Sequence, residues 1–167
     1  MKNLIFTFVL LLTASVAFSQ SSASSYKSAK EGWLVNLDEA YSISKKTGKP
    51  IMANFTGSDW CGWCKRLDAA VFSKDEFKKW AKDNVVLLEL DFPRRTQLPT
   101  EIQQQNAGLQ RAFKVQGFPT IWVFDLDKDA TSGKYQISAI GRTGYTPTVD
   151  QFTTGVDQML AKKQAGS

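Results

Sequence analysis

The 167-residue chain contains only two cysteines, Cys61 and Cys64, and two residues separate them. They follow an apolar run, Ile51–Phe55, and they open a stretch with helical periodicity. A strand followed by Cys-x-x-Cys at the start of a helix is typical of a reversible thiol–disulfide centre. The unpaired N–H groups and the dipole of a helix start favour an anion, so we expect a stabilised thiolate at Cys61. Cys64, about one turn further on, could close a disulfide with Cys61 and resolve a mixed disulfide.

Three other roles for this cysteine pair are less consistent with the sequence. A static structural disulfide would close a loop too short to constrain the unfolded chain strongly. A zinc site usually needs four Cys or His ligands, and the chain has no further cysteine and no histidine. Haem attachment requires a histidine directly after the second cysteine, where this chain has Lys65. The redox interpretation is therefore favoured, with neither a metal nor an organic cofactor.

Residues 1–19 have the pattern of a secretory signal peptide. Lys2 supplies the positive start, and Leu4–Leu12 is an apolar core too short to span a bilayer. Ala17 and Ser19 suit cleavage before residue 20, with cleavage after Ala17 or an uncleaved anchor as alternatives. An exported chain with only two cysteines is no disulfide scaffold. We therefore expect it to act on the thiols of other proteins, in the periplasm or as a secreted protein.

The charge of the chain narrows its partners. The formal net charge of +5 falls to +4 once the predicted signal peptide, with its single lysine, is removed. The remaining lysines are scattered and no Gly-rich phosphate loop accompanies them, so nucleic-acid binding is not expected. The absence of histidine excludes Ser-His and Cys-His catalysis.

The apolar periodicity predicts one domain, residues 33–167, after a flexible Ser-rich lead-in over residues 20–32. Its elements should follow in the order α, β, α, α, β, α, β, β, α, with parallel strands first and a hairpin near the end. The predicted helices are Leu37–Lys46 capped by Asn36, one from Cys61 that buries Cys64, Leu67 and Val71, one through Trp80 capped by Ser73 with Glu76, Glu101–Phe113, and one from Pro147 to about Lys162. The predicted strands are Ile51–Phe55, Val85–Leu90, Thr120–Phe124 and Tyr135–Ile140.

These motifs resemble the thioredoxin superfamily. The matching segments are Lys49–Met52, which leads the first strand, Trp60–Lys65 around the cysteines, and Gly117–Thr120 before a later strand. The resemblance covers roughly residues 37–163, and it is greatest to exported thioredoxin-like proteins and to the periplasmic domain of disulfide-interchange electron carriers. It implies an α/β thioredoxin fold, with a central mixed β-sheet flanked by helices and an N-terminal helical extension.

The resemblance also assigns roles to residues of this chain. Cys61 is expected to be the nucleophile and Cys64 the resolving thiol. Pro119 matches the family's cis-proline, which leaves neighbouring backbone free to pair with an extended substrate. The residues expected to border the substrate are Trp60, Gly62, Trp63 and Phe118. The other tryptophans, Trp33, Trp80 and Trp122, are expected to be packing residues.

Three features depart from the family pattern. Asn54 stands where thioredoxins usually bury an acidic proton acceptor, so another group or water must take the proton of Cys64. Trp63 replaces the proline or histidine before the second cysteine, and without a charge-stabilising histidine we expect a reductant or isomerase over a strong oxidant. Phe92–Leu109 is longer than in a minimal thioredoxin, and either shapes partner choice or is a tolerated insertion.

The sequence thus predicts an exported thiol–disulfide oxidoreductase that reduces or isomerises protein disulfides. Its expected partners are cysteine-containing exported proteins and a membrane electron donor, with no stable membrane insertion after signal removal. Two alternatives belong to other classes. A copper(I) carrier could use the two soft thiolates, although no Met or His cluster accompanies them. A non-catalytic binding module could use the same scaffold, since fold does not determine function.

Overall fold

The computed structural model describes residues 26–165. The predicted signal peptide and the first part of the lead-in lie outside these residues. The described chain contains a four-stranded sheet in the order β2-β1-β3-β4. β1 is parallel to β2 and antiparallel to β3, and β3 and β4 form an antiparallel hairpin. The strands are β1 Ile51–Thr56, β2 Val86–Asp91, β3 Thr120–Lys128 and β4 Tyr135–Thr143.

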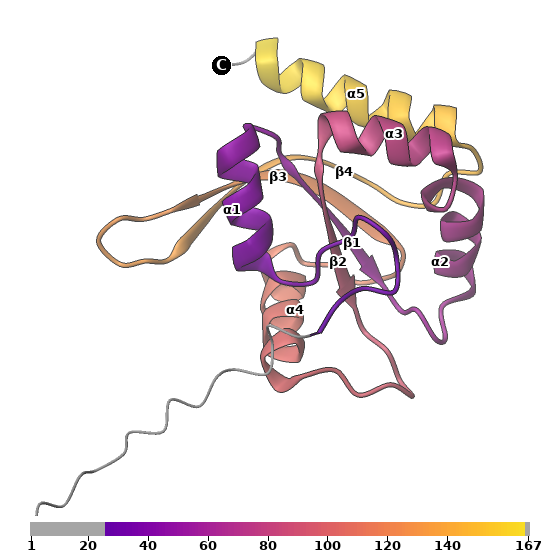
Figure 1. Ribbon diagram of the computed structural model, residues 1–167, viewed down its shortest axis with the longest axis horizontal. Coiled ribbons are helices and arrows are strands. Elements are labelled where there is room, and N and C mark those ends of the chain that lie inside the picture. Colours follow the sequence, from indigo (N-terminus) through magenta and orange to yellow (C-terminus); the bar gives the residue numbers. More distant parts are fainter. Residues whose placement is uncertain (1–25, 166–167) are drawn as a thin grey trace, which may run out of the picture.

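Helices cover both faces of this sheet (Figure 1). α1 and α4 pack on one face, and α2, α3 and α5 pack on the other. The helices are α1 Leu37–Thr47, α2 Gly62–Leu67, α3 Asp75–Asn84, α4 Thr100–Ala112 and α5 Val149–Ala165, and a π-helical turn, Asp68–Phe72, continues α2. The element order and the predicted thioredoxin fold class are confirmed.

The central strand β1 divides the core into two halves. All six of its residues are buried, because neighbouring strands and both helical layers enclose it. Ile51, Ala53 and Phe55 belong to the core under α1 and α4, whereas Met52 belongs to the core under α2, α3 and α5. The alternation of side chains along a strand therefore places Asn54 on the same face as α2.

The start of α3 differs from the prediction. Ser73 was expected to cap this helix, but α3 begins at Asp75 after Lys74, and no side chain caps it. The π-helical turn is the reason, because it leaves Ser73 in a helical conformation with its N–H bonded to the Asp68 carbonyl. The Ser73 hydroxyl donates back to the Ala69 carbonyl at 3.3 Å. The predicted capping box is therefore wrong.

The C-terminal elements also have different bounds. Pro147 was predicted as the first residue of the last helix, but α5 starts at Val149, and the Thr148 hydroxyl accepts from the Gln151 N–H at 3.3 Å. The strand predicted to end at Phe124 continues to Lys128, since the β3–β4 ladder extends to the pair Lys128 and Tyr135. Cross-strand pairing holds these polar residues in extended structure, where local sequence favoured a turn.

Candidate active site

Cys61 and Cys64 lie just beyond the end of β1 and are joined by a disulfide. A turn closed by the Cys61 N–H on the Gly57 carbonyl, at 2.8 Å, directs the chain into α2. Cys61 is the N-cap of α2, and its sulfur accepts the Cys64 N–H at 3.2 Å. A negative charge on this sulfur would meet an unpaired helix N–H and the positive end of the helix dipole. The expected position of the pair at a helix start is confirmed.

Both cysteines are nearly enclosed, with Cys61 5% and Cys64 6% exposed. Cys64, Leu67 and Val71 are buried while Trp63 and Arg66 point outward, as the helical spacing predicted. The two cysteines therefore differ little in burial. The expected difference in their thiolate stability comes from the position of Cys61 at the helix start.

Trp60 is fixed beside Cys61 by several contacts. Its indole N–H donates to the Phe92 carbonyl at 2.8 Å, and its ring centroid lies 5.9 Å from that of Phe118. The ring also lies against Gly57, where an added Cβ would be 2.5 Å from the indole. The Phe118–Pro119 bond is cis, as predicted. The Trp60–Phe118 contact brings this bond to the same end of the molecule as the cysteines.

Trp63 is the most exposed of the predicted substrate-facing aromatic residues. Its ring meets that of Tyr145 edge-on at 5.0 Å, and the Arg66 guanidinium lies over it at 4.7 Å. Gly62, between the cysteines, is exposed with open space around its α-carbon. Sequence reasoning missed Tyr145, which lies in the loop between β4 and α5. An aromatic residue in the polar Gly-Tyr-Thr-Pro segment was the available signal.

The segment after β2 is fastened to the active site. The Asp59 carboxylate accepts backbone N–H groups of Arg94, at 3.0 and 3.1 Å, and of Arg95, at 2.7 Å. These bonds, that of Arg94 above all, lower the pKa of Asp59. The Arg94 guanidinium then lies 3.9 Å from the ring centroid of Trp60. The first part of the long segment Phe92–Leu109 is therefore built into the surroundings of Cys61.

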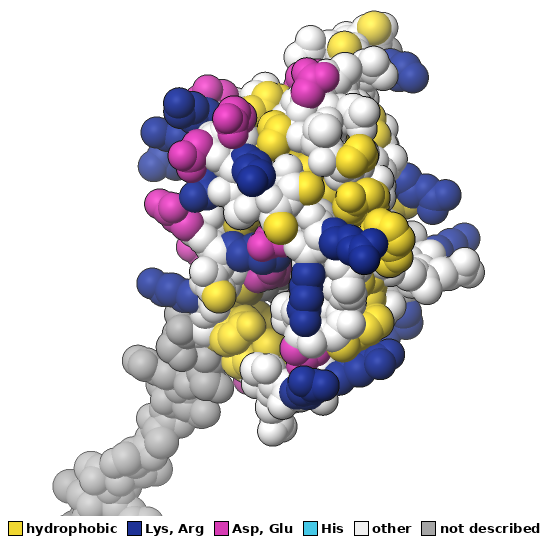
Figure 2. All heavy atoms as spheres, turned by 90° about the vertical axis from the view of Figure 1, so that its right-hand side faces the viewer, with side chains coloured by type: hydrophobic (Ala, Val, Ile, Leu, Met, Phe, Trp, Pro, Cys, Tyr) yellow, Lys and Arg dark blue, Asp and Glu magenta, His cyan; other side chains and the backbone are white. Residues whose placement is uncertain are grey.

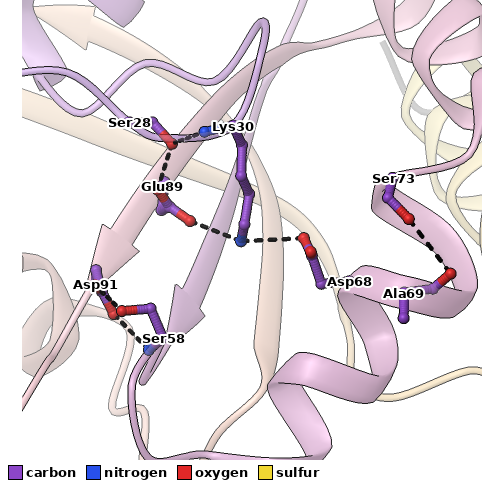
Figure 3. A network of polar contacts seen from close by, with 8 residues as sticks. All are labelled: Ser28, Lys30, Ser58, Asp68, Ala69, Ser73, Glu89 and Asp91. Carbon is purple, nitrogen blue, oxygen red and sulfur yellow. Dashed lines mark hydrogen bonds and ion pairs between the residues drawn. The ribbon is translucent and has the colours of Figure 1, made fainter.

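An ionic cluster of one buried and two half-buried residues lies on the sheet face beneath α2 (Figure 3). Glu89 of β2 is the register partner of Asn54, and its carboxylate lies 2.7 Å from the Lys30 ammonium. The same ammonium lies 3.2 Å from the carboxylate of Asp68, which follows α2. Burial lowers the pKa of Lys30, but Glu89 and Asp68 outweigh it and the pKa is raised overall. Lys30 belongs to the predicted lead-in, whose described part, residues 26–32, reaches under the active-site helix.

Asn54 itself is buried beside this cluster. Its side-chain oxygen has no hydrogen-bond partner among residues 26–165. Glu89, whose carboxylate could accept a proton, therefore lies next to the position where thioredoxins carry an acidic residue. The signal for Glu89 was a charged residue within the apolar run Val85–Leu90. Nothing in the sequence indicated Lys30, which is 59 positions away from Glu89.

Trp33 is buried and Trp80 and Trp122 are half-buried, as predicted. Within residues 26–165, no group of three or more His, Cys, Asp or Glu side chains could hold a metal ion. In the same range, no helix has the length and apolar character needed to cross a membrane. The catalytic and substrate-binding roles of the predicted residues stay predictions.

Residues 37–152 match the sequence profile of the thioredoxin-like domain, and the chain belongs to this family. It is 39% identical over 89 residues to the disulfide bond reductase DsbH of Chlamydia pneumoniae, which is 53% of this chain and 54% of that protein. It is 30% identical over 118 residues to the protein disulfide-isomerase erp38 of Neurospora crassa, which is 70% of this chain and 28% of that protein. The chain thus spans about half, or less, of the length of these curated relatives.

The fold similarity is more extensive than these sequence matches. A solved structure of a DsbH oxidoreductase superposes with a TM-score of 0.67 and 30% identity, over 90% of this chain and 95% of that one. A thioredoxin from Thermus thermophilus superposes with a TM-score of 0.54 and 19% identity, which shows the shared fold alone.

Proposed function

We propose that the protein is an exported thiol–disulfide oxidoreductase that reduces or isomerises disulfides of other proteins. One observation carries the proposal: the Cys61–Cys64 disulfide caps α2, with the Cys64 N–H directed at the Cys61 sulfur. That geometry stabilises a thiolate at Cys61 once the pair is reduced. The similarity to DsbH, which is named a disulfide bond reductase, supports the same activity.

The reaction begins with the reduced pair. The Cys61 thiolate attacks one sulfur of a partner disulfide, so that a mixed disulfide forms and one partner thiolate leaves. Cys64 then loses its proton and attacks the Cys61 sulfur. The mixed disulfide breaks, the second partner thiolate leaves, and the Cys61–Cys64 disulfide is restored. Two electrons pass to the partner, whose two thiolates take up protons.

The other site residues contribute contacts in this proposal. Trp60, Trp63 and Phe118 supply apolar surface around the cysteines, and Gly62 leaves the approach to them open. Pro119 is assigned to the substrate-facing side, next to Phe118. No metal or organic cofactor takes part, because the two thiols carry both electrons.

The cellular setting is part of the proposal. Signal cleavage before residue 20 would release the chain into the periplasm, where the oxidised pair must be reduced again. We infer a dithiol donor held at the membrane for that step.

Single-cysteine variants test the proposal. The mature chain beginning at Gln20 should reduce a disulfide-containing test protein, and Cys61→Ser should abolish this activity. Cys64→Ser should instead accumulate mixed disulfides through Cys61, and mass spectrometry of the trapped proteins would identify substrates and donor. Near-normal activity in Cys61→Ser would refute the assigned roles. A purified protein unable to cycle between dithiol and disulfide would indicate a non-catalytic binding module.

A further inference from the structure

Exposed aromatic rings concentrate around the cysteines. Four large hydrophobic side chains are exposed among residues 26–165, and three of them lie at the active site. These are Trp60 at 37%, Trp63 at 53% and Tyr145 at 39% exposure. Trp60 and Trp63 lie on either side of Cys61 in the chain, and Tyr145 extends the ring surface beyond Trp63. These three residues, together with Arg66 and Arg94, are called the active-site rim below.

Each tryptophan of the rim has an arginine guanidinium over its ring. The guanidinium carbon of Arg94 lies 3.9 Å from the Trp60 ring centroid, and that of Arg66 lies 4.7 Å from the Trp63 ring centroid. A guanidinium over an indole face is held in place while its N–H groups can still donate in the guanidinium plane. Both arginines are exposed, and within residues 26–165 no ion pair joins either of them to a carboxylate. In the part of the chain that the structure describes, the rim therefore presents two positioned cations that no carboxylate pairs with.

Next to the rim in the chain, Lys65 and Arg95 are positively charged and Asp59 is negatively charged. Lys65 donates to the Asp59 backbone carbonyl at 3.1 Å, so that contact does not neutralise it. The Asp59 carboxylate keeps its negative charge, but it accepts backbone N–H groups of Arg94 and Arg95, and within residues 26–165 no ion pair joins it to a guanidinium. Figure 2 looks onto the α2 side of the molecule and shows Lys and Arg side chains bordering an exposed hydrophobic strip. The surface around Cys61 is therefore aromatic, with more positive than negative charges.

We propose that the active-site rim selects partner segments that carry Asp or Glu on both sides of the reactive cysteine. The partner backbone crosses Trp60 and Trp63 in extended form, and its carboxylates pair with Arg94 and Arg66. A carboxylate fits the planar fork of a guanidinium, and complementary charge mainly raises the association rate. The inference rests on the proposed function, because it concerns the partner of the same cysteine pair.

Three cyclic disulfide peptides test the charge preference. They share one sequence except for the residues flanking the cysteines, which are Glu, Gln or Lys. Each second-order rate constant for reduction by the prereduced protein is divided by that for dithiothreitol, which corrects for intrinsic disulfide reactivity. The Glu peptide should react about fivefold faster than the Gln peptide and the Lys peptide about fivefold slower, and high salt should compress both differences.

The outcomes separate this inference from the proposed function. Equal normalised rates for the three peptides would overturn the inference and leave the reductase activity standing. If the unmodified protein reduced the Gln peptide no faster than the Cys61→Ser variant does, the proposed function would be refuted instead.

Arginine variants assign the preference to the rim. Arg66→Gln combined with Arg94→Gln should remove the difference between the Glu and Gln peptides, and Arg94→Glu should favour the Lys peptide. Arg111→Gln, which removes an exposed arginine from the last turn of α4, is the matched control and should keep the preference of the unmodified protein. A double variant that still prefers the Glu peptide would refute the assignment to Arg66 and Arg94.

Discussion

At the scale of single residues, the two cysteines differ in their relation to α2 more than in their burial. The Cys61 sulfur receives the Cys64 N–H, whereas Cys64 sits within the helix. In the reduced protein, iodoacetamide should therefore modify Cys61 before Cys64, because the thiolate is the reactive form. Mass spectrometry of partially alkylated protein measures the order. Equal modification of both thiols would show that the helix start gives Cys61 no advantage.

Asn54 allows a second test at this scale. Asn54→Asp would place a carboxyl group on the buried face next to Glu89, so burial and like charge would raise the pKa of the new carboxyl. The substitution should reduce the free energy of unfolding by about 1–3 kcal/mol. Because the folded state favours the protonated form, this loss should grow as pH rises. Urea unfolding at pH 5 and pH 8 measures it.

The same variant tests proton transfer from Cys64. A carboxyl group with a raised pKa could accept that proton near neutral pH, and release of the mixed disulfide should then be faster. Stopped-flow reduction of a disulfide peptide across pH compares Asn54→Asp with the unmodified protein. Identical pH–rate profiles would mean that position 54 takes no part in proton transfer.

At the scale of elements, the turn between β1 and α2 depends on Gly57. Gly57→Ala would place a methyl group 2.5–2.8 Å from the Trp60 ring, so the indole must move away from Phe118 and Arg94. We expect a loss of about 1–3 kcal/mol in stability and slower disulfide reduction. Urea unfolding and reduction kinetics measure both effects.

Gly108 provides the control for this substitution. It lies within α4, and a methyl group there would meet nothing within 4 Å. Gly108→Ala should raise the stability by about 0.5–1 kcal/mol, because glycine is a poor residue inside a helix. Unchanged activity in Gly57→Ala would contradict a role for the Trp60 position.

The segment before α1 is tied to the sheet by Lys30. Lys30→Met would leave Glu89 buried without its cation, and should destabilise the fold by about 3–5 kcal/mol. Adding Glu89→Gln should recover part of this loss. Lys45→Met, which breaks an exposed pair with Asp127, is the control and should change stability little. Urea unfolding of the unmodified protein and the three variants measures these changes in stability. Equal losses of stability in Lys30→Met and Lys45→Met would contradict the importance of the Lys30–Glu89 pair.

The same pair predicts a dependence on alkaline pH. The pKa of Lys30 is raised in the folded protein, so its favourable contribution is complete below the usual lysine range. It is lost as pH rises through the raised pKa. The stability difference between the unmodified protein and Lys30→Met should therefore narrow in strong alkali.

At the scale of the whole molecule, local signals predicted much of the fold. The cysteine pair and the apolar runs each lie within a few consecutive residues, so their chemistry or periodicity could be read directly. The cis-proline followed only from the resemblance of its segment to the thioredoxin superfamily. The Asn36 cap was predicted for the same reason, and the Glu39 N–H does bond to its side chain at 3.0 Å. The prediction of Ser73 as a helix cap was wrong because the preceding helix ends in a π-helical turn, which no short-range sequence pattern indicated.

The surroundings of the site were much less predictable. Arg94 reaches Trp60, Tyr145 reaches Trp63, and Lys30 reaches Glu89 only after the strands have paired. Each contact joins residues 34 or more positions apart in the sequence. Side chains from segments far apart in the sequence therefore complete a centre of which the sequence indicated only the cysteines and the residues next to them and to the cis-proline.

The two edge strands of the sheet, β2 and β4, differ in how far their outer backbone groups are paired, because Leu34 forms a bridge with Leu88 of β2. The Leu34 N–H and carbonyl bond to Leu87 and Glu89, so they occupy backbone groups on the outer side of β2. Among the described residues, no strand pairs with the outer side of β4. Unpaired edge strands are where the sheets of separate molecules can pair and aggregate. Self-association of this protein should therefore begin at β4 while Leu34 stays hydrogen-bonded to β2. Detachment of the segment before α1 would expose β2 as a second edge strand, through which the molecules could polymerise.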